Sequence, residues 1–184
     1  MSVVPNRDRS TGCCYGSSAI EDDFVVVKKT VKIVVLGNSA VGKTTLINRL
    51  TIQDDTDYVL PSEPLTVGAA YTNVRLNDVE CNIWDTAGQE KYRALAPIYL
   101  RNCDICVIAY SLVDEASKRD ITIWDNLIST HSPNAVKVII ATMQDIRSTS
   151  SKCLSESDVV ISSLTGCGIQ QLKNILSAAA KAMV

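Results

Sequence analysis

The segment LGNSAVGKTT, from Leu36 to Thr45, decides how the rest of the sequence is interpreted. Within it, Gly37 to Thr44 matches the pattern G-x-x-x-x-G-K-T. A β-branched run, VKIVVLG (Val31 to Gly37), leads into the pattern, and Thr44 to Leu50 has the composition of a helix. A glycine-rich loop of this spacing, placed between a buried strand and a helix, predicts a binding site for phosphate groups.

The chemistry of this loop suits phosphate. Glycines let the backbone turn tightly and aim its N–H groups inward, and the helix that follows adds its own N–H groups and dipole. The Lys43 ammonium can reach terminal phosphates, and the Thr44 hydroxyl suits Mg²⁺. A plain glycine turn beside a surface lysine would not need these flanking elements. The loop residues expected to contact a nucleotide are Gly37, Ser39, Ala40, Val41, Gly42, Lys43, Thr44 and Thr45.

Strands and helices alternate along the remainder of the chain. AYTNVRL and VECNIWD alternate in polarity around Asn77-Asp78, which predicts an antiparallel hairpin. The runs DICVIAYSL and VKVIIATM predict two buried strands, and DVVISSL predicts a short last strand. Helices are expected over Glu115 to Ser129 and over Gly168 to Met183. This alternation predicts an α/β fold with a mostly parallel sheet.

The composition excludes several classes of protein. A chain of 184 residues with 46% hydrophobic residues suits one globular domain. The net charge of −2 gives no electrostatic argument for nucleic acid. Seven cysteines without paired CxxC motifs indicate free thiols in a reducing compartment. No stretch resembles a signal peptide or approaches the ~20 apolar residues of a membrane span, so a cytoplasmic protein is expected.

Residues 1–24 are polar and contain Gly, Ser and Pro without a sustained period, so we expect a flexible extension before one domain over 25–184. The lone histidine, His131, lies in a predicted loop. It supports neither a metal site nor a Ser–His–Asp hydrolase, because the sequence has no nucleophile elbow and no second histidine.

A second motif separates the classes of phosphate-binding protein. WDTAGQEKY runs from Trp84 to Tyr92, at the end of the predicted hairpin. Asp85 is placed for a contact to Mg²⁺, the Gly88 N–H for a terminal phosphate, and Gln89 for orienting an attacking water. Taken singly, Asp85 is equally well explained as a helix cap and Gln89 as an exposed amide. The complete nonapeptide is far more specific.

TVGAAY (Thr66 to Tyr71), followed by WDTAGQEKYRALAPIYLR, resembles the Ras superfamily of small GTPases, and within it the early-endosomal branch of the Rab family. The resemblance extends from about Val31 to the end of the chain. It implies a six-stranded G-domain fold, bound Mg²⁺ with GTP or GDP, and slow GTP hydrolysis that an activating protein accelerates. It also implies residence on the cytosolic face of endosomal or vesicle membranes.

The resemblance assigns roles to individual residues. Lys43, Thr66 and Gln89 are the implied catalytic set, and Thr44, Thr66 and Asp85 the implied metal set. Residues 59–71 and 85–97 correspond to two switch regions, which would contact effectors, an exchange factor and an activating protein. Considered without the resemblance, Thr66 would be an ordinary threonine at the start of a strand.

Base recognition is expected at TMQD, Thr142 to Asp145, where the family pattern is N-K-x-D. Asp145 retains the carboxylate that pairs with the N1 and N2 donors of guanine. Met143 replaces the lysine; it can cover the base with apolar surface but makes no polar link to the phosphate loop. We therefore expect weaker or faster-exchanging nucleotide without loss of specificity, although a core residue at the end of a strand explains Met143 alone equally well. The residues expected at the base are Thr142, Met143, Asp145, Ile146, Ser162, Ser163 and Leu164.

The sequence also departs from the family. Ser162 follows Asp145 by 17 positions, so the helix before the last strand is expected to be shortened or absent. The hairpin region from Thr66 to Asp85 looks trimmed by a few residues. The chain ends at AAAKAMV without a cysteine to prenylate, so membrane contact, if it occurs, is expected to be peripheral. Cys13 and Cys14 are the candidates for S-acylation, although two thiols in a flexible tail are the better explanation of them.

Two further classes of function compete with a switch. Met143, the missing tail and the trimmed loops favour an adaptor subunit that holds a guanine nucleotide without cycling. Intact Thr44, Thr66, Asp85 and Gln89 oppose that interpretation. An ATPase or kinase is opposed by Asp145 and by the motif at residues 84–92.

Overall fold

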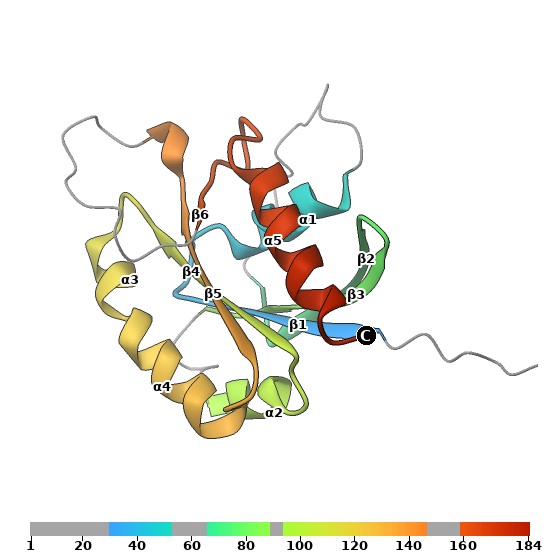
Figure 1. Cartoon of the computed structure of the whole chain (residues 1–184). Helices are drawn as coiled ribbons and strands as arrows, with labels where there is room; N and C mark the ends of the chain where they lie inside the picture. Colours follow the sequence, from blue (N-terminus) through green and yellow to red (C-terminus); the bar gives the residue numbers. More distant parts are fainter. Residues whose placement is uncertain (1–29, 53–65, 89–93, 147–158) are drawn as a thin grey trace, which may run out of the picture.

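A central six-stranded sheet organises the chain (Figure 1). The computed structural model describes residues 30–52, 66–88, 94–146 and 159–184. The strand order is β2-β3-β1-β4-β5-β6. The strands are β1 (Val31–Leu36), β2 (Ala69–Leu76), β3 (Val79–Thr86), β4 (Ile105–Ser111), β5 (Val136–Thr142) and β6 (Val159–Val160). The predicted α/β fold with six strands is confirmed.

One pairing in this sheet is antiparallel and the others are parallel. β2 runs back along β3, with Leu76 opposite Val79 and Ala69 opposite Thr86. Asn77 makes the turn with a φ of 52°, a conformation that asparagine tolerates better than most residues. β1 pairs in parallel with β3 and β4, and β5 pairs in parallel with β4 and β6. The predicted hairpin is confirmed.

Helices cover both faces of the sheet and divide the core in two (Figure 1). α1 (Lys43–Thr51) and α5 (Ile169–Lys181) pack on one face. α2 (Ala96–Leu100) and α4 (Ile121–His131) contribute to the core of the other, and α3 (Glu115–Arg119) contacts β4 and α4. Successive side chains of β1 point to opposite faces of the sheet. Ile33 and Val35 therefore belong to the first core, and Val34 and Leu36 to the second. No helix in the described ranges is long and apolar enough to cross a membrane.

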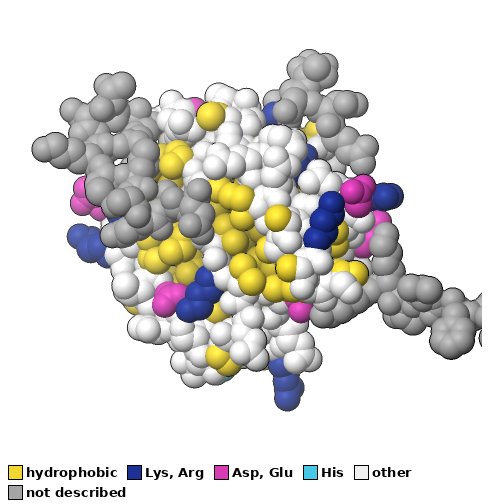
Figure 2. Space-filling view, in the orientation of Figure 1, with side chains coloured by type: hydrophobic (Ala, Val, Ile, Leu, Met, Phe, Trp, Pro, Cys, Tyr) yellow, Lys and Arg dark blue, Asp and Glu magenta, His cyan; other side chains and the backbone are white. Residues whose placement is uncertain are grey.

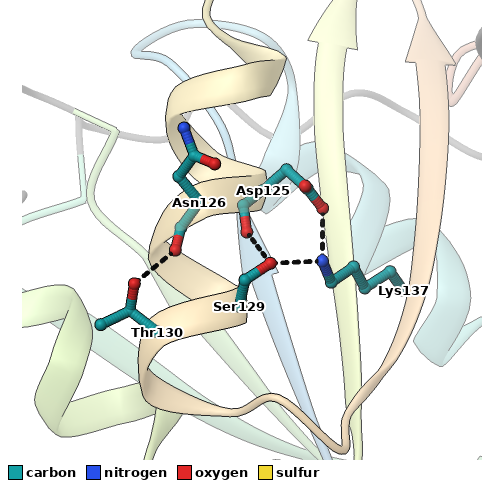
Figure 3. A network of polar contacts seen from close by, with 5 residues as sticks. All are labelled: Asp125, Asn126, Ser129, Thr130 and Lys137. Atoms are coloured by element: carbon teal, nitrogen blue, oxygen red, sulfur yellow. Dashed lines mark hydrogen bonds and ion pairs between the residues drawn. The ribbon is translucent and has the colours of Figure 1, made fainter.

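α4 is tied to the neighbouring strand by polar side chains (Figure 3). The Lys137 ammonium in β5 donates to Asp125 Oδ1 at 2.6 Å and to Ser129 Oγ at 2.8 Å. Ser129 in turn donates to the Asp125 carbonyl oxygen at 2.9 Å. Beyond this contact, Figure 2 shows apolar side chains at the surface between α4 and α5, at the end of the sheet that holds β5 and the edge strand β6.

Three predicted elements differ from the structure. The helix expected over Glu115 to Ser129 is two helices, α3 and α4, which meet at Asp120, the residue that ends α3 and precedes α4. The last strand is reduced to two residues, since Ser162 N–H turns away to donate to Cys167 O. The final helix begins at Ile169 and ends at Lys181.

Two other expectations lie outside the described residues. They are the shortened helix, which would fall in 147–158, and the flexible extension over 1–24 with Cys13 and Cys14. The boundary of the domain at residue 25 therefore stays a prediction.

Candidate functional site

The phosphate loop predicted from the sequence joins the carboxyl end of β1 to α1. Three of its residues have positive φ: Gly37 at 146°, Ala40 at 59° and Gly42 at 86°. A side chain at Gly37 would place its Cβ 2.1 Å from the Ala109 carbonyl oxygen, so glycine is required there. Ligand sites at the carboxyl ends of parallel strands are the rule in α/β sheets, and this loop lies at that end.

Lys43 opens α1 and folds back over the loop. Its side chain is 6% exposed, and Nζ donates to Gly37 O at 2.9 Å and to Asn38 O at 2.7 Å. Burial lowers the pKa of Lys43 to about 8, and the nearby carboxylate of Asp85 acts in the opposite direction. A buried ammonium of this kind gains from any anion that enters the loop.

Three oxygen-bearing side chains meet beside Lys43. Thr44 Oγ1 lies 2.9 Å from Thr66 Oγ1 and donates to Asp85 Oδ2 at 2.5 Å. Thr66 Oγ1 lies 3.2 Å from the same carboxylate oxygen. These residues come from α1, from the segment before β2, and from β3. Hydroxyl and carboxylate oxygens are the ligands that Mg²⁺ prefers, so the residues present fit that ion together with phosphate oxygens.

Gly88 lies against the same loop. A Cβ at this position would fall 2.3 Å from Asn38 O and 2.4 Å from Lys43 Nζ, so a side chain is excluded. The backbone of Gly88 is therefore within reach of a group bound by Lys43. Gln89 lies outside the described residues, and its predicted role stays a prediction.

The predicted base-binding residues lie on the other side of the loop. Thr142 is buried, and its Oγ1 lies 2.7 Å from Val41 O and 3.0 Å from Tyr110 O. Met143 has a φ of 60°, and its Sδ accepts from Ser111 Oγ at 3.1 Å. Its terminal methyl comes within 3.9 Å of where a Gly42 Cβ would lie. Met143 thus packs against the phosphate loop without offering it a donor.

Asp145 is held by Ser162. Ser162 Oγ donates to Asp145 Oδ1 at 2.6 Å and accepts from the Thr165 N–H at 3.1 Å. Ser162 is fully buried, so its side chain orients Asp145, whereas Ile146 (62% exposed) and Leu164 (46% exposed) lie on the surface. The structure therefore brings the two predicted base segments together. Ser163 is half-buried beside them.

Comparison with known proteins agrees with this geometry. The model of the Ras family matches residues 32–173. The chain belongs to the Ras family. Its relatives within the family are Rab and Ypt proteins, which makes it a Rab-like member.

The relatives of this Ras-family chain come from several organisms. It is 35% identical to "GTP-binding protein ypt5" of Schizosaccharomyces pombe, over 63% of this chain and 56% of the relative. It is 38% identical to "Ras-related protein Rab-5A" of Dictyostelium discoideum, over 62% of this chain and 58% of the relative. The matched part of the chain thus spans less than two thirds of these relatives.

Sequence reasoning missed a row of aromatic side chains beside the site of this Ras-family chain. The ring of Trp84 in β3 lies 5.5 Å from that of Tyr71 and 5.9 Å from that of Tyr99. Tyr71 is 54% exposed, and the nearby chain carries Val67 at 75% and Ile98 at 64%. The alternating polarity of AYTNVRL places Tyr71 on the outer face of the hairpin, and this pattern could have predicted an exposed aromatic side chain there.

Proposed function

We propose that the chain is a guanine-nucleotide switch that binds Mg²⁺ with GTP or GDP and hydrolyses GTP. The convergence of Thr44, Thr66 and Asp85 next to Lys43 carries this proposal, because it combines a phosphate-binding cation with the ligands of a hard metal ion. The pairing of Asp145 with Ser162 supports guanine as the base.

Each residue of the site has a separate proposed role in binding or hydrolysing GTP. The N–H groups of the loop and the Lys43 ammonium would bind the phosphate oxygens and stabilise charge that develops on the transferred group. Thr44 and Thr66 would hold Mg²⁺, with Asp85 behind them, and the ion when bound neutralises phosphate charge. Gln89 is the residue proposed to orient the attacking water. We expect slow turnover alone and acceleration by an activating protein that supplies a further cation.

Partner proteins would bind next to the nucleotide. The segments 59–71 and 85–97 contain Thr66 and Asp85, and their described parts carry exposed Val67, Tyr71 and Leu95. Exposed apolar and aromatic side chains in one area are typical of protein interaction sites. Thr66 belongs to both the metal cluster and this surface. Loss of the terminal phosphate would therefore change the surface that effectors, the exchange factor and the activating protein bind. The Rab resemblance supports a role in endosomal or vesicle traffic.

The co-purifying nucleotide and its hydrolysis test the proposal. We expect guanine nucleotide in the purified protein and slow single-turnover hydrolysis of GTP. Gln89→Leu should lower the rate by at least about tenfold, since it removes the group that orients water. An adenine nucleotide in the site would contradict guanine recognition. A wild-type protein that neither hydrolyses nor exchanges GTP would contradict the switch.

A second function is favoured by one observation. The methyl group of Met143 lies 3.9 Å from where a Gly42 Cβ would be, its sulfur accepts from Ser111 Oγ, and it offers the loop no cation. An adaptor subunit that holds guanine nucleotide without cycling needs no such link. The two functions differ in whether nucleotide exchanges and GTP is consumed.

Met143→Lys measures what the missing cation contributes. The substitution keeps an unbranched stem at the same backbone position and adds an ammonium that can donate to carbonyls of the phosphate loop. We expect it to slow GDP dissociation about tenfold, the effect of one charge-assisted hydrogen bond. Release of a fluorescent GDP analogue after addition of excess GDP measures the rate. Met143→Leu, which adds no charge, should leave the rate near that of the wild type; equal rates for the lysine and leucine variants would contradict the argument.

A further inference from the structure

Asn38 links the phosphate loop to a distant part of the fold. Its side-chain amide uses both ends: Nδ2 donates to Asp120 Oδ2 at 2.8 Å, and Oδ1 accepts from Trp124 Nε1 at 3.0 Å. The partners lie 82 and 86 residues further along the chain. Rotation of the amide by 180° would turn its NH₂ toward the indole N–H and its oxygen toward the carboxylate. One orientation of Asn38 is therefore fixed.

The backbone of Asn38 is part of the phosphate site. Its carbonyl oxygen accepts from Lys43 Nζ at 2.7 Å, and it is also the atom against which Gly88 packs. Whatever fixes the Asn38 side chain thus also fixes a carbonyl that holds the ammonium of Lys43. The two bonds of the amide and the bond of the carbonyl form one connected network.

The far end of this network is the junction between two helices. The backbone N–H of Asp120 donates to Ala116 O at the end of α3. Its backbone carbonyl accepts from the backbone N–H of Trp124 at 3.2 Å in the first turn of α4. Trp124 is 2% exposed and belongs to the core between α4 and the sheet. Neither end can shift far without disturbing packed groups, so the position of the junction is transmitted to the loop.

We propose that Asn38 is a positioning residue for Lys43, and that through it the α3–α4 junction sets the geometry of the phosphate site. This inference rests on the proposed function, since it concerns the same nucleotide site. Asn38 does not touch the phosphates by its side chain. It acts through the carbonyl that holds Lys43.

An exchange of side chains tests the proposal. Asn38→Asp places a carboxylate against the carboxylate of Asp120, whereas Asp120→Asn keeps a side-chain oxygen that can accept from the Asn38 NH₂ group and should have little effect by itself. In the double variant, the carboxylate at position 38 accepts from the indole N–H of Trp124 and from the side-chain amide at position 120. The network is then restored with its polarity reversed at one bond. A role that did not depend on this contact would give additive effects.

The readout is single-turnover hydrolysis of GTP loaded beforehand, because it does not depend on how much nucleotide binds. We expect Asn38→Asp to slow hydrolysis about tenfold, as for the loss of a partly buried hydrogen bond with a repulsive carboxylate in its place, and the double variant to return within about twofold of the wild type. Dissociation of a fluorescent GDP analogue should follow the same pattern. Asp125→Asn is the matched control: it removes a carboxylate on α4 that bonds Lys137 and should leave the rate unchanged.

Asn38→Ala provides a second route if Asn38→Asp does not fold by circular dichroism. It removes both bonds without adding charge, so it should be slow, and Asp120→Asn should not rescue it. The proposal is overturned if the double variant slows hydrolysis by the product of the factors measured for its two single variants. It is also overturned if the Asn38→Ala protein hydrolyses GTP at the wild-type rate. A wild-type protein that binds no guanine nucleotide refutes the proposed function instead, so the two failures are distinguishable.

Discussion

Replacing Lys43 by methionine is expected to lower the affinity for GDP on the order of a thousandfold. Hydrogen bonds to charged groups contribute about 1.5–3 kcal/mol each, and the ammonium has more than one phosphate oxygen within its expected reach. The side chain is nearly buried, so water replaces the lost cation poorly. Calorimetric titration of the nucleotide-free protein with GDP in excess Mg²⁺ measures the change.

The control for this experiment is Lys181→Met. Lys181 is on α5, and its Nζ contacts Asp78 at 3.4 Å on the surface. That substitution removes the same charge from the chain, so it should leave GDP binding unchanged. Comparable affinities for the Lys43→Met and wild-type proteins would show that the phosphates bind elsewhere.

Asp145→Asn is expected to exchange the preferred base from guanine to xanthine. Guanine presents N1 and N2 donors, which need a carboxylate, whereas xanthine has a carbonyl oxygen in place of the N2 amino group. Ser162 Oγ donates to Asp145 Oδ1, and an asparagine Oδ1 accepts the same bond. The Nδ2 group then takes the place of the second carboxylate oxygen and offers a donor to the xanthine carbonyl. A site of this kind rejects the mismatched base by roughly 10⁴-fold.

Competition between GDP and xanthosine diphosphate measures this exchange. Asp78→Asn, at the turn of the hairpin, makes the same chemical change away from the site and should keep the preference for guanine. If the Asp145→Asn protein still preferred GDP, Asp145 would not be the group that reads the base. Loss of both nucleotides together would point instead to damage of the loop that holds Ser162.

The parts of the fold that sequence reasoning predicted well are those with local causes. The loop at Gly37 needs a residue without a Cβ, and the turn at Asn77 needs a positive φ, so both leave a mark on the sequence itself. The alternation of β1 between two cores likewise follows from strand geometry.

What sequence reasoning missed depends on contacts between distant segments. The break at Asp120 lies inside a run with helical spacing, and no local signal there shows that the side chain bonds Asn38. The role of Ser162 as the partner of Asp145 depends on two loops that meet only in the folded chain. The last strand ends early because Ser162 bonds across its own loop to Cys167. At Asp120 and Asp145 the tertiary contact overrides the local pattern, whereas the last strand is ended by a bond within its own loop.

The hairpin at Asn77 also bears on the order of folding. Among the described strands, β2 and β3 are the one pair joined by a short turn; the other pairings are parallel and connect segments far apart in the chain. Closing such long connections costs conformational entropy before the contacts form. We therefore expect the β2–β3 ribbon to form early and β1 to dock on it afterwards. Asp85, which lies at the end of this ribbon and is proposed to stand behind the metal ligands, would then meet Thr44 only once the central sheet is assembled.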